Sequence, residues 1–286
     1  MKDPDILRLE ATVPKEEAEN AEFLLCGLGS SSTLEKPHDD KKFVTVVACF
    51  NSSERSEPLL KLEAAQAFKA FPGLRDADIL VQRERIADYT ELCKQHFAPF
   101  EIAKGIVVVP SWERYVPRAN ESVINLDPGM AFGTGLHETT KLCAEAIESC
   151  AHRASSMLDV GTGSGILAIT ARLLGVRNIC AIENDPDALE VAKENFEKNS
   201  CSDILLAQRI EDAGLGFDLV VANILLPTLI ELRDPIMKRV APHGTLVLSG
   251  ITPDQEDEIK DAYGRGFTSS EAKRRGEWSA VIFRRG

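Results

Sequence analysis

The chain has 286 residues, of which 44% are hydrophobic and 27% are charged. This balance excludes a disordered or fibrous protein, and the length predicts two domains of unequal size. The formal net charge of -12 argues against binding nucleic acid through its phosphates, because each such contact needs a Lys or Arg that the chain lacks in net terms. A basic partner would be attracted instead, although acidity also serves solubility alone.

The cysteines and the first residues indicate where the protein works. Its 7 cysteines are odd in number, widely spread and without a Cys-x-x-Cys pair, which favours reduced, buried thiols over disulfides or zinc ligands. Residues 1–8 are charged where a signal peptide needs an apolar run, and no stretch approaches the ~18 apolar residues of a membrane helix. We therefore expect a cytoplasmic protein without a membrane segment and without a metal site.

The first third of the chain predicts a small sandwich of two helices on a four-stranded sheet. Alternating apolar residues predict the strands, and helical spacing followed by Gly or Pro predicts the helices. In chain order these are a strand at 6–13, a helix from 14, strands at 30–35 and 43–50, a helix at 59–71 and a strand at 79–85. This order is typical of the ferredoxin-like fold, which hosts many unrelated functions.

A short polar helix at 88–97 is the expected connector, which gives a domain at 1–86, a linker and hinge at 87–100 and a second domain at 101–286. From residue 156, apolar strands alternate with helices, which predicts a doubly wound, Rossmann-like α/β sheet. The strands are expected at 157–160, 178–182, 204–208, 217–222 and 244–249, and the helices at 166–174, 188–198 and 225–240. A hairpin of 267–273 with 278–284 predicts an antiparallel last strand at the sheet edge.

Three glycines, Gly161, Gly163 and Gly165, follow the first of these strands and precede a helix. Glycines allow a sharp turn and a close approach of the backbone to a ligand, and the helix N-terminus offers free amides. The dinucleotide fingerprint needs its third glycine where Ile166 stands, which argues against a nicotinamide oxidoreductase. The pattern Gly-x-Gly-x-Gly after a strand that carries Asp159 resembles the glycine loop of class I S-adenosylmethionine methyltransferases.

Polar residues follow the next strands. Glu183 ends the strand at 178–182, where its carboxylate can accept both hydroxyls of a ribose. Alternatively, residues 183–185 only cap the helix that Pro186 begins. We assign the ribose to Glu183 and the cap to Asp185.

Asn223 follows the strand at 217–222 and has two possible roles. Its side-chain oxygen, with a neighbouring backbone carbonyl, can accept hydrogen bonds from a target nitrogen and so orient the nitrogen lone pair. Alternatively, it is the N-cap of the helix that begins at Ile224.

The stretch 127–140 places three glycines around Phe132 immediately before a helix. Such a loop can fold over a ligand, and Thr139 or Thr140 at the helix start can bind it by a hydrogen bond. His137 is either a proton acceptor or a structural hydrogen-bonding residue.

Together, residues 127–140, 159–169 and 223–225 resemble the PrmA family, which methylates large-subunit ribosomal protein eleven. Residues 110–113 and 276–278 also resemble it, so matching motifs run from about 88 to the end, and the first domain agrees only in its order of elements. The resemblance implies cofactor contacts at Thr140, Gly161, Glu183 and Asn223. We add Gly163, Gly165, Asp159 and Thr134 as cofactor-binding candidates.

Two residues depart from the family pattern: Glu183 stands where aspartate is common, and Leu226 stands where alanine is common. A glutamate still reaches a ribose, whereas Leu226 could narrow the amine pocket.

The sequence therefore predicts an S-adenosylmethionine-dependent protein N-methyltransferase that acts as a monomer on a basic ribosomal protein. The resemblance implies that the first domain recognises this protein and that its lysine side chains and α-amine are methylated. The catalytic candidates are Asn223, His137 and Phe132, with His137 or water taking the proton of the amine. The alternatives are methylation of another protein or a small amine, a nicotinamide oxidoreductase, and a non-catalytic binding module.

Overall fold

The computed structural model describes residues 5–30, 32–52, 55–69, 71–85, 88, 91, 94, 97–127 and 135–286. The described residues form two compact units, a smaller one up to Ala98 and a larger one from Pro99 on.

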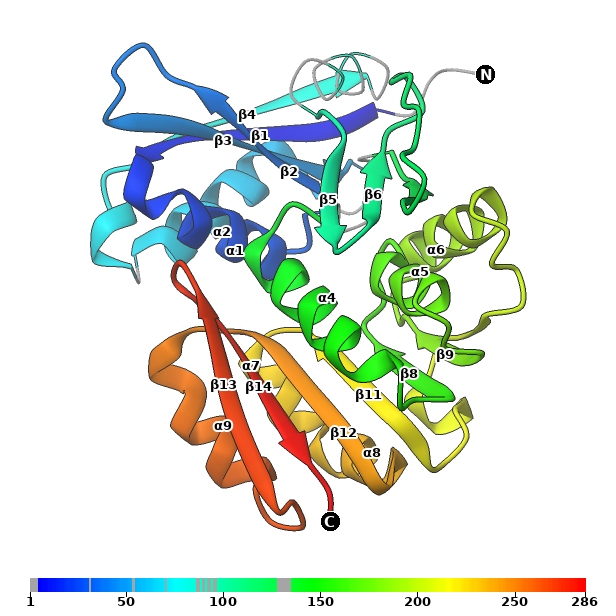
Figure 1. Cartoon of the computed structure of the whole chain (residues 1–286). Helices are drawn as coiled ribbons and strands as arrows, with labels where there is room; N and C mark the ends of the chain where they lie inside the picture. The colour runs from blue at the N-terminus through cyan, green and yellow to red at the C-terminus, as the bar shows by residue number, and fades with distance from the viewer. Residues whose placement is uncertain are drawn as a thin grey trace. The chain divides into compact units, whose positions relative to one another are not determined.

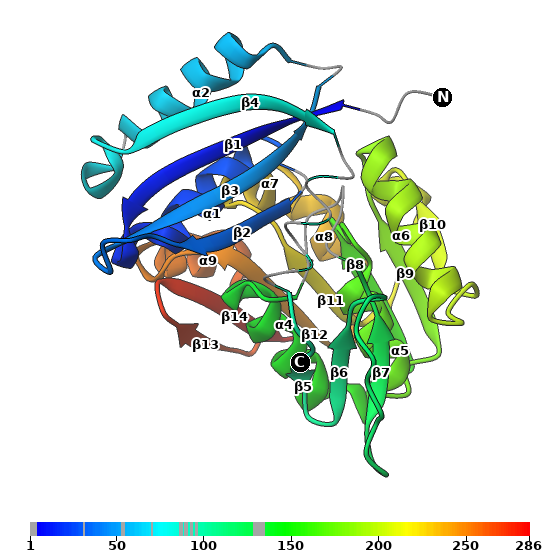
Figure 2. The same cartoon turned by 90° about the horizontal axis from the view of Figure 1, so that it is seen from above.

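The smaller unit is a four-stranded antiparallel sheet with two helices. Its strands are β1 (Asp5–Pro14), β2 (Ser32–Pro37), β3 (Phe43–Asn51) and β4 (Asp78–Arg85), and its helices are α1 (Ala18–Gly27) and α2 (Glu57–Lys69). The strand order β2-β3-β1-β4 can be followed in Figure 2, and both helices lie on one face of the sheet, below it in Figure 1. Leu7 and Leu9 of β1 and Phe68 of α2 share the buried core. This arrangement confirms the predicted ferredoxin-like sandwich.

The larger unit is built on a seven-stranded sheet of order β10-β9-β8-β11-β12-β14-β13. Neighbouring strands from β10 to β12 are parallel, whereas β14 is antiparallel to both of its neighbours. The strands are β8 (Ser156–Val160), β9 (Asn178–Ile182), β10 (Leu205–Ala207), β11 (Phe217–Asn223), β12 (Val240–Ile251), β13 (Ser269–Arg275) and β14 (Trp278–Arg284). The doubly wound α/β class with an antiparallel last strand is confirmed.

The position of that last strand is not the predicted one. β14 lies between β12 and β13, so that β13 occupies the edge. Residues 278–283 of β14 are all buried, whereas most residues of β13 are exposed and polar. Charged side chains favour an edge position, because they discourage pairing with another chain.

Helices cover both faces of this sheet: α4 and α5 lie on one side, and α7, α8 and α9 on the other (Figure 1). The α-helices described in this unit are α4 (Glu138–Ala151), α5 (Ile166–Leu173), α6 (Pro186–Lys198), α7 (Leu226–Glu231), α8 (Arg233–Arg239) and α9 (Glu256–Tyr263). The single helix predicted at 225–240 is therefore wrong. Pro235 has no amide hydrogen for Glu231, and its ring collides with that carbonyl, so the chain breaks at Leu232 between α7 and α8.

The larger unit also contains a small second sheet, which the sequence did not predict. It contains β5 (Phe100–Ala103), β6 (Ile106–Val109) and β7 (Ser122–Asn125), with β6 between an antiparallel β5 and a parallel β7 (Figure 2). Of the helix expected at 88–97, Asp88, Glu91 and Lys94 are helical, and most of the rest lies outside the described residues. None of the helices that the structure describes has the length and apolar character needed to span a membrane.

Candidate cofactor and active site

The three glycines after β8 form a loop with positive φ at each: 72° at Gly161, 53° at Gly163 and 84° at Gly165. The amides of Gly161 and Thr162 both donate to the carbonyl of Ile182, each at 2.9 Å, which ties the loop to the end of β9. L-residues with side chains rarely adopt such φ values, so the chain turns sharply here only because glycine permits it.

Two of these glycines are also required by packing. A Cβ added at Gly161 would lie 2.5 Å from Cγ2 of Ile224, and one at Gly165 would lie 2.5 Å from Cε1 of Phe196. Gly161 thus lets the loop pack against the residue after Asn223, which brings the ends of β8 and β11 together. Gly165 lets the loop pack against α6.

Asp159 is buried and fixes the loop from β8. It is 1% exposed, and its Oδ2 accepts a hydrogen bond from Oγ1 of Thr162 at 2.6 Å. Burial raises the pKa of Asp159 to about 7, the hydrogen bond from Thr162 opposes this, and the nearby carboxylate of Glu183 adds to it. Asp159 therefore supports the loop through Thr162, and its role as a direct cofactor contact stays a prediction.

Glu183 follows β9 and faces the same loop. Its Oε2 accepts from the amide of Gly163 at 2.9 Å, and its Oε1 accepts from the amide of Asp185 at 3.1 Å. The side chain is buried, and burial raises its pKa. Each carboxylate oxygen keeps acceptor capacity beyond these bonds, which two ribose hydroxyls would use. Asp185 accepts from the amide of Asp187 at 2.9 Å as the N-cap of α6, so its predicted capping role is confirmed.

Asn223 is the last residue of β11, and it does not cap a helix. The N-cap of α7 is Leu225, which contradicts the capping alternative. The Nδ2 of Asn223 donates to Oγ1 of Thr140 at 3.5 Å, while its Oδ1 is buried and has no hydrogen-bond partner among the residues that the structure describes. A buried acceptor left in this way costs about 1–3 kcal/mol. The amide oxygen is thus available to a donor that a ligand brings.

Thr140 and His137 lie at the start of α4. Thr140 is buried and faces Asn223, as described above. His137 is the N-cap of α4: its Nδ1 accepts from the amide of Thr139 at 3.3 Å and lies 2.7 Å from Oγ1 of Thr139. Its ring also packs edge-on against Trp278, with ring centroids 4.9 Å apart.

The electrostatic surroundings of His137 make it a weak base. Burial, and then the charge of Lys141, lower its pKa to about 4. The ring is therefore neutral at pH 7, and its Nδ1 already serves as the helix cap. These contacts favour the structural role over the proton acceptor, whose assignment stays a prediction.

The structure brings together four segments that the sequence singled out separately: residues 137–140, residues 159–165, Glu183 and Asn223. Phe132 and Thr134 lie outside the described residues. Leu226 begins α7, half-buried against the core of the sheet. The sequence reading missed Trp278 as the partner of His137, although it noted the motif that contains it. No group of three or more His, Cys, Asp or Glu side chains able to hold a metal ion occurs within the described ranges.

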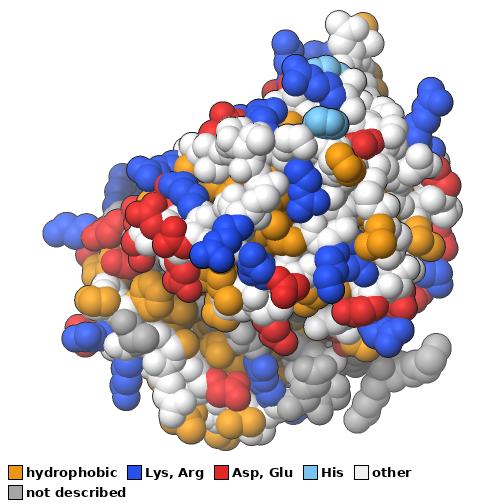
Figure 3. Space-filling model, turned by 90° about the horizontal axis from the view of Figure 1, so that it is seen from below, with side chains coloured by type: hydrophobic (Ala, Val, Ile, Leu, Met, Phe, Trp, Pro, Cys, Tyr) orange, Lys and Arg blue, Asp and Glu red, His pale blue; other side chains and the backbone are white. Residues whose placement is uncertain are grey.

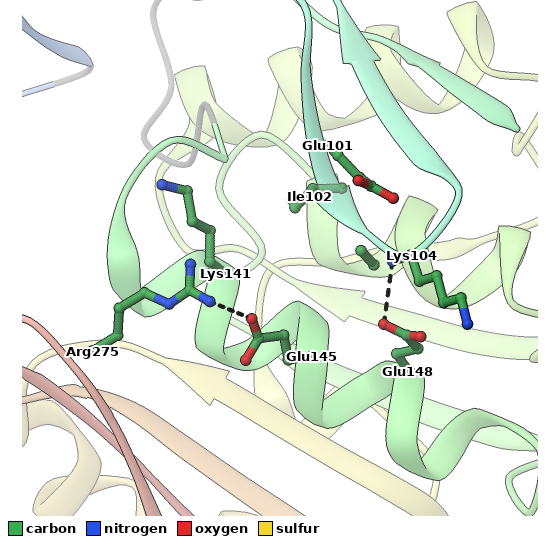
Figure 4. A pocket seen from close by; sticks show the side chains of 8 residues that line it. Glu101, Ile102, Lys104, Lys141, Glu145, Glu148 and Arg275 are labelled. Carbon is green, nitrogen blue, oxygen red and sulfur yellow. Dashed lines mark hydrogen bonds and ion pairs between the residues drawn. The ribbon is translucent and has the colours of Figure 1, made fainter. Parts of the chain in front are cut away.

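An open pocket of about 360 Å³ lies elsewhere in the larger unit (Figure 4). It is lined by residues of β5 and α4 and by neighbours of both: Glu101, Ile102, Ala103, Lys104, Lys141, Glu145, Glu148 and Arg275. Arg275 pairs with Glu145 and, at 3.2 Å, with Glu138. None of the described cofactor-binding candidates lines this pocket, so it is separate from the predicted cofactor site.

The residues around the glycine loop fit S-adenosylmethionine on two observations. The positive φ values give a backbone that a ligand can approach closely, with the buried carboxyl of Glu183 beside it. The amide oxygen of Asn223 lies at the neighbouring strand end, ready to accept a hydrogen bond. Ligands of such sheets bind at this edge, outside the carboxyl ends of the strands.

Comparison with known proteins gives a consistent result. The family model described as ribosomal protein L11 methyltransferase (PrmA) matches residues 7–286. The ribosomal protein L11 methyltransferase of Citrifermentans bemidjiense is 42% identical over 229 residues, which cover 77% of this chain and 74% of the relative. That of Geobacter metallireducens is 39% identical over 254 residues, covering 87% of this chain and 84% of the relative.

A solved structure agrees. The crystal structure of a ribosomal protein L11 methylase from Lactobacillus delbrueckii subsp. bulgaricus has 34% sequence identity and a TM-score of 0.62, and covers 66% of this chain and 99% of that chain. These matches confirm the resemblance noted in the sequence. The chain belongs to the ribosomal protein L11 methyltransferase (PrmA) family.

Proposed function

We propose that this chain transfers methyl groups from S-adenosylmethionine to amino groups of ribosomal protein L11, its lysine side chains and its α-amine. Membership of the family makes the chain an S-adenosylmethionine-dependent methyltransferase. The observation that carries the choice of an amine is the buried amide oxygen of Asn223, which has no partner among the described residues. An amine brings the N–H donors that this oxygen needs.

In this mechanism Glu183 binds the ribose hydroxyls, and the loop 161–165 approaches the rest of the cofactor. The bound cofactor supplies a methyl group activated by a positive sulfur. Burial raises the pKa of two carboxyls near the loop, Asp159 and Glu183, and a bound cation would favour their ionised forms. What remains for the protein is to align the amine for an in-line attack.

Asn223 performs this alignment by accepting an N–H of the amine, which directs the nitrogen lone pair to the methyl group. A lysine has a reference pKa of about 10.4 and must lose its proton first. Removal from water in the site favours the neutral amine. With its pKa of about 4 and its Nδ1 capping α4, His137 is a poor acceptor for this proton, so we assign the proton to water.

The partner is proposed to be recognised by the smaller unit, and the net charge of -12 suits a basic protein. On the face drawn in Figure 3, Lys and Arg side chains are interspersed with Asp and Glu, which does not favour a nucleic-acid surface there. The described cysteines Cys26, Cys49, Cys143, Cys150, Cys180 and Cys201 form no disulfide, which is in keeping with the reducing cytoplasm that we propose. We propose that the enzyme works there as a monomer, and a sedimentation measurement tests its state of association.

The experiment combines the protein with methyl-labelled S-adenosylmethionine and all ribosomal proteins of a cell extract, followed by mass spectrometry of labelled bands. Label is expected on L11, and it should appear about 100-fold more slowly when Asn223→Ala replaces the wild type. Free lysine and an unrelated basic protein serve as competing acceptors. Labelling of these at the same rate as L11 would contradict the proposed substrate.

Deleting residues 1–86 tests whether the smaller unit recognises the substrate. The deletion should preserve cofactor binding and abolish methylation of folded L11.

A further inference from the structure

Helix α6 carries a buried polar side chain that contacts the glycine loop. Asn195 is 3% exposed, and its Nδ2 donates to the carbonyl of Ser164 at 2.8 Å. On the other side of the same peptide unit, the amide of Gly165 donates to the carbonyl of Thr162 at 2.9 Å. Because a peptide unit is planar, two bonds on opposite sides fix its orientation. Asn195 therefore holds the loop in the conformation that leads into α5.

The next residue of α6 reinforces this contact. The ring of Phe196 is buried and leaves no room for a Cβ at Gly165, which would lie 2.5 Å from Cε1. Asn195 and Phe196 thus hold two successive loop residues, one by a hydrogen bond and the other by packing. Helix α6 begins at Pro186, three residues after Glu183, whose Oε2 accepts from the amide of Gly163. The loop is consequently contacted by the residue that follows β9, before α6, and by two residues near the C-terminal end of α6.

The residue after α6 links the same helix to the small sheet. The Oδ1 of Asn199 accepts from the amide of Asn125 at 2.7 Å, and its Nδ2 donates to the carbonyl of Asn125 at 2.9 Å. Nδ2 also donates to the carbonyl of Asn195 at 2.8 Å. Asn125 is the last residue of β7, and nearby Nζ of Lys198 lies 3.7 Å from Oδ2 of Asp127. The side chain of Asn199 therefore joins the end of α6 to the end of β7, because it binds both the amide and the carbonyl of Asn125.

We propose that Asn195 and Asn199 are positioning residues, which through α6 set the place of the glycine loop relative to the end of β7. Neither side chain contacts the cofactor in this scheme. They act through the carbonyl of Ser164 and the backbone of Asn125. The benefit for the reaction is a cofactor loop already formed before binding, so that binding does not have to order it. This inference rests on the proposed function, in which the loop binds S-adenosylmethionine.

The test replaces Asn195 with Asp, which keeps the size but turns an acceptor toward the carbonyl of Ser164. Asn195→Ala removes the donor without adding a charge. Lys193→Ala is the matched control, because Lys193 lies on the same helix in an exposed ion pair with Glu190. Two quantities are measured: hydrogen–deuterium exchange of the amides of 161–165 in protein without cofactor, and kcat and KM for S-adenosylmethionine.

Both Asn195 variants should speed exchange of the Gly165 amide and raise KM for S-adenosylmethionine by about 10- to 100-fold, while kcat changes much less. Asn199→Asp keeps the acceptor for Asn125 but loses the donor, so it should fall between wild type and Asn199→Ala. Variants that only melt earlier, with exchange at 161–165 and KM equal to those of Lys193→Ala, would show a purely structural role and overturn the proposal. Wild-type protein that binds no S-adenosylmethionine would contradict the proposed function instead, and the exchange measurement does not depend on that result.

Discussion

The side chain of Asn223 contributes little to the stability of the fold, and this makes its replacement by alanine informative. Its Nδ2 bond to Thr140, at 3.5 Å, is at the long limit of a hydrogen bond and contributes less than about 1 kcal/mol. Its Oδ1 is buried without a partner among the described residues, which costs about 1–3 kcal/mol. Removing the whole amide should therefore leave the free energy of unfolding within about 1 kcal/mol of wild type, or raise it.

The effect of Asn223→Ala on catalysis should be of another size. An amine that loses the side-chain acceptor of Asn223 is misplaced relative to the methyl group, and such misplacement costs about 100-fold in rate, equivalent to about 2.7 kcal/mol. Single-turnover methyl transfer gives the rate, and calorimetry gives the melting temperature. Asn178→Ala is the control. Asn178 is exposed and is the first residue of β9, so it lies at the end of that strand away from Glu183 and the glycine loop.

Asn223→Asp separates orientation from charge. A carboxylate next to the amine holds the amine protonated, so the activity of this variant should move to higher pH. An Asn223→Ala enzyme that methylates at the wild-type rate would refute the mechanism. If Asn223→Ala lowers the activity only as far as it lowers the fraction of folded protein, the argument on stability is refuted.

Three further predictions concern other buried groups. Glu183→Ala should weaken binding of S-adenosylmethionine by about 1.5–3 kcal/mol for each charge-assisted hydrogen bond lost; isothermal titration with an unchanged dissociation constant would place the ribose elsewhere. Trp278→Ala should cost about 3–5 kcal/mol of stability and, by admitting water, raise the pKa of His137 from about 4 toward its ordinary 6.5, which an NMR titration of the ring would detect. The hydrogen bonds from Arg274 lower the pKa of Glu256 from 4.5 to about 2, so their stabilisation is complete above pH 4.5 and is lost as pH falls toward 2. The urea midpoints of wild type and Glu256→Gln should therefore converge over that window, and a constant difference would exclude this linkage.

The parts of the site that sequence reasoning located are those whose geometry is local. The strand, the glycines and the helix start lie within a dozen residues, and glycine at positive φ leaves few alternative conformations. Asp185 could be recognised as a cap because Pro186 follows it at the first helical position. At Asn223 the local pattern left two roles open, and the capping role is excluded because α7 begins at Leu226 with Leu225 as its N-cap.

What could not be predicted depends on contacts distant in sequence. The low pKa of His137 follows from burial next to Trp278, which lies on the last strand. The small sheet escaped notice because β5 and β7 have four residues each, and β7 pairs in parallel with β6 only after an irregular connection. Such short strands carry too few residues for an alternating pattern to stand out.

The interior position of β14 has a consequence for biosynthesis. Strands β1 to β4 all come from the first 85 residues, so the smaller sheet can assemble while the rest of the chain is still being translated. In the larger sheet, β12 obtains its second neighbour only from residues 279–284, and β13 has no partner before them. Ribosomes stalled short of Arg284 should therefore carry nascent chains in which the four-stranded sheet is complete and the seven-stranded sheet is incomplete and sensitive to protease.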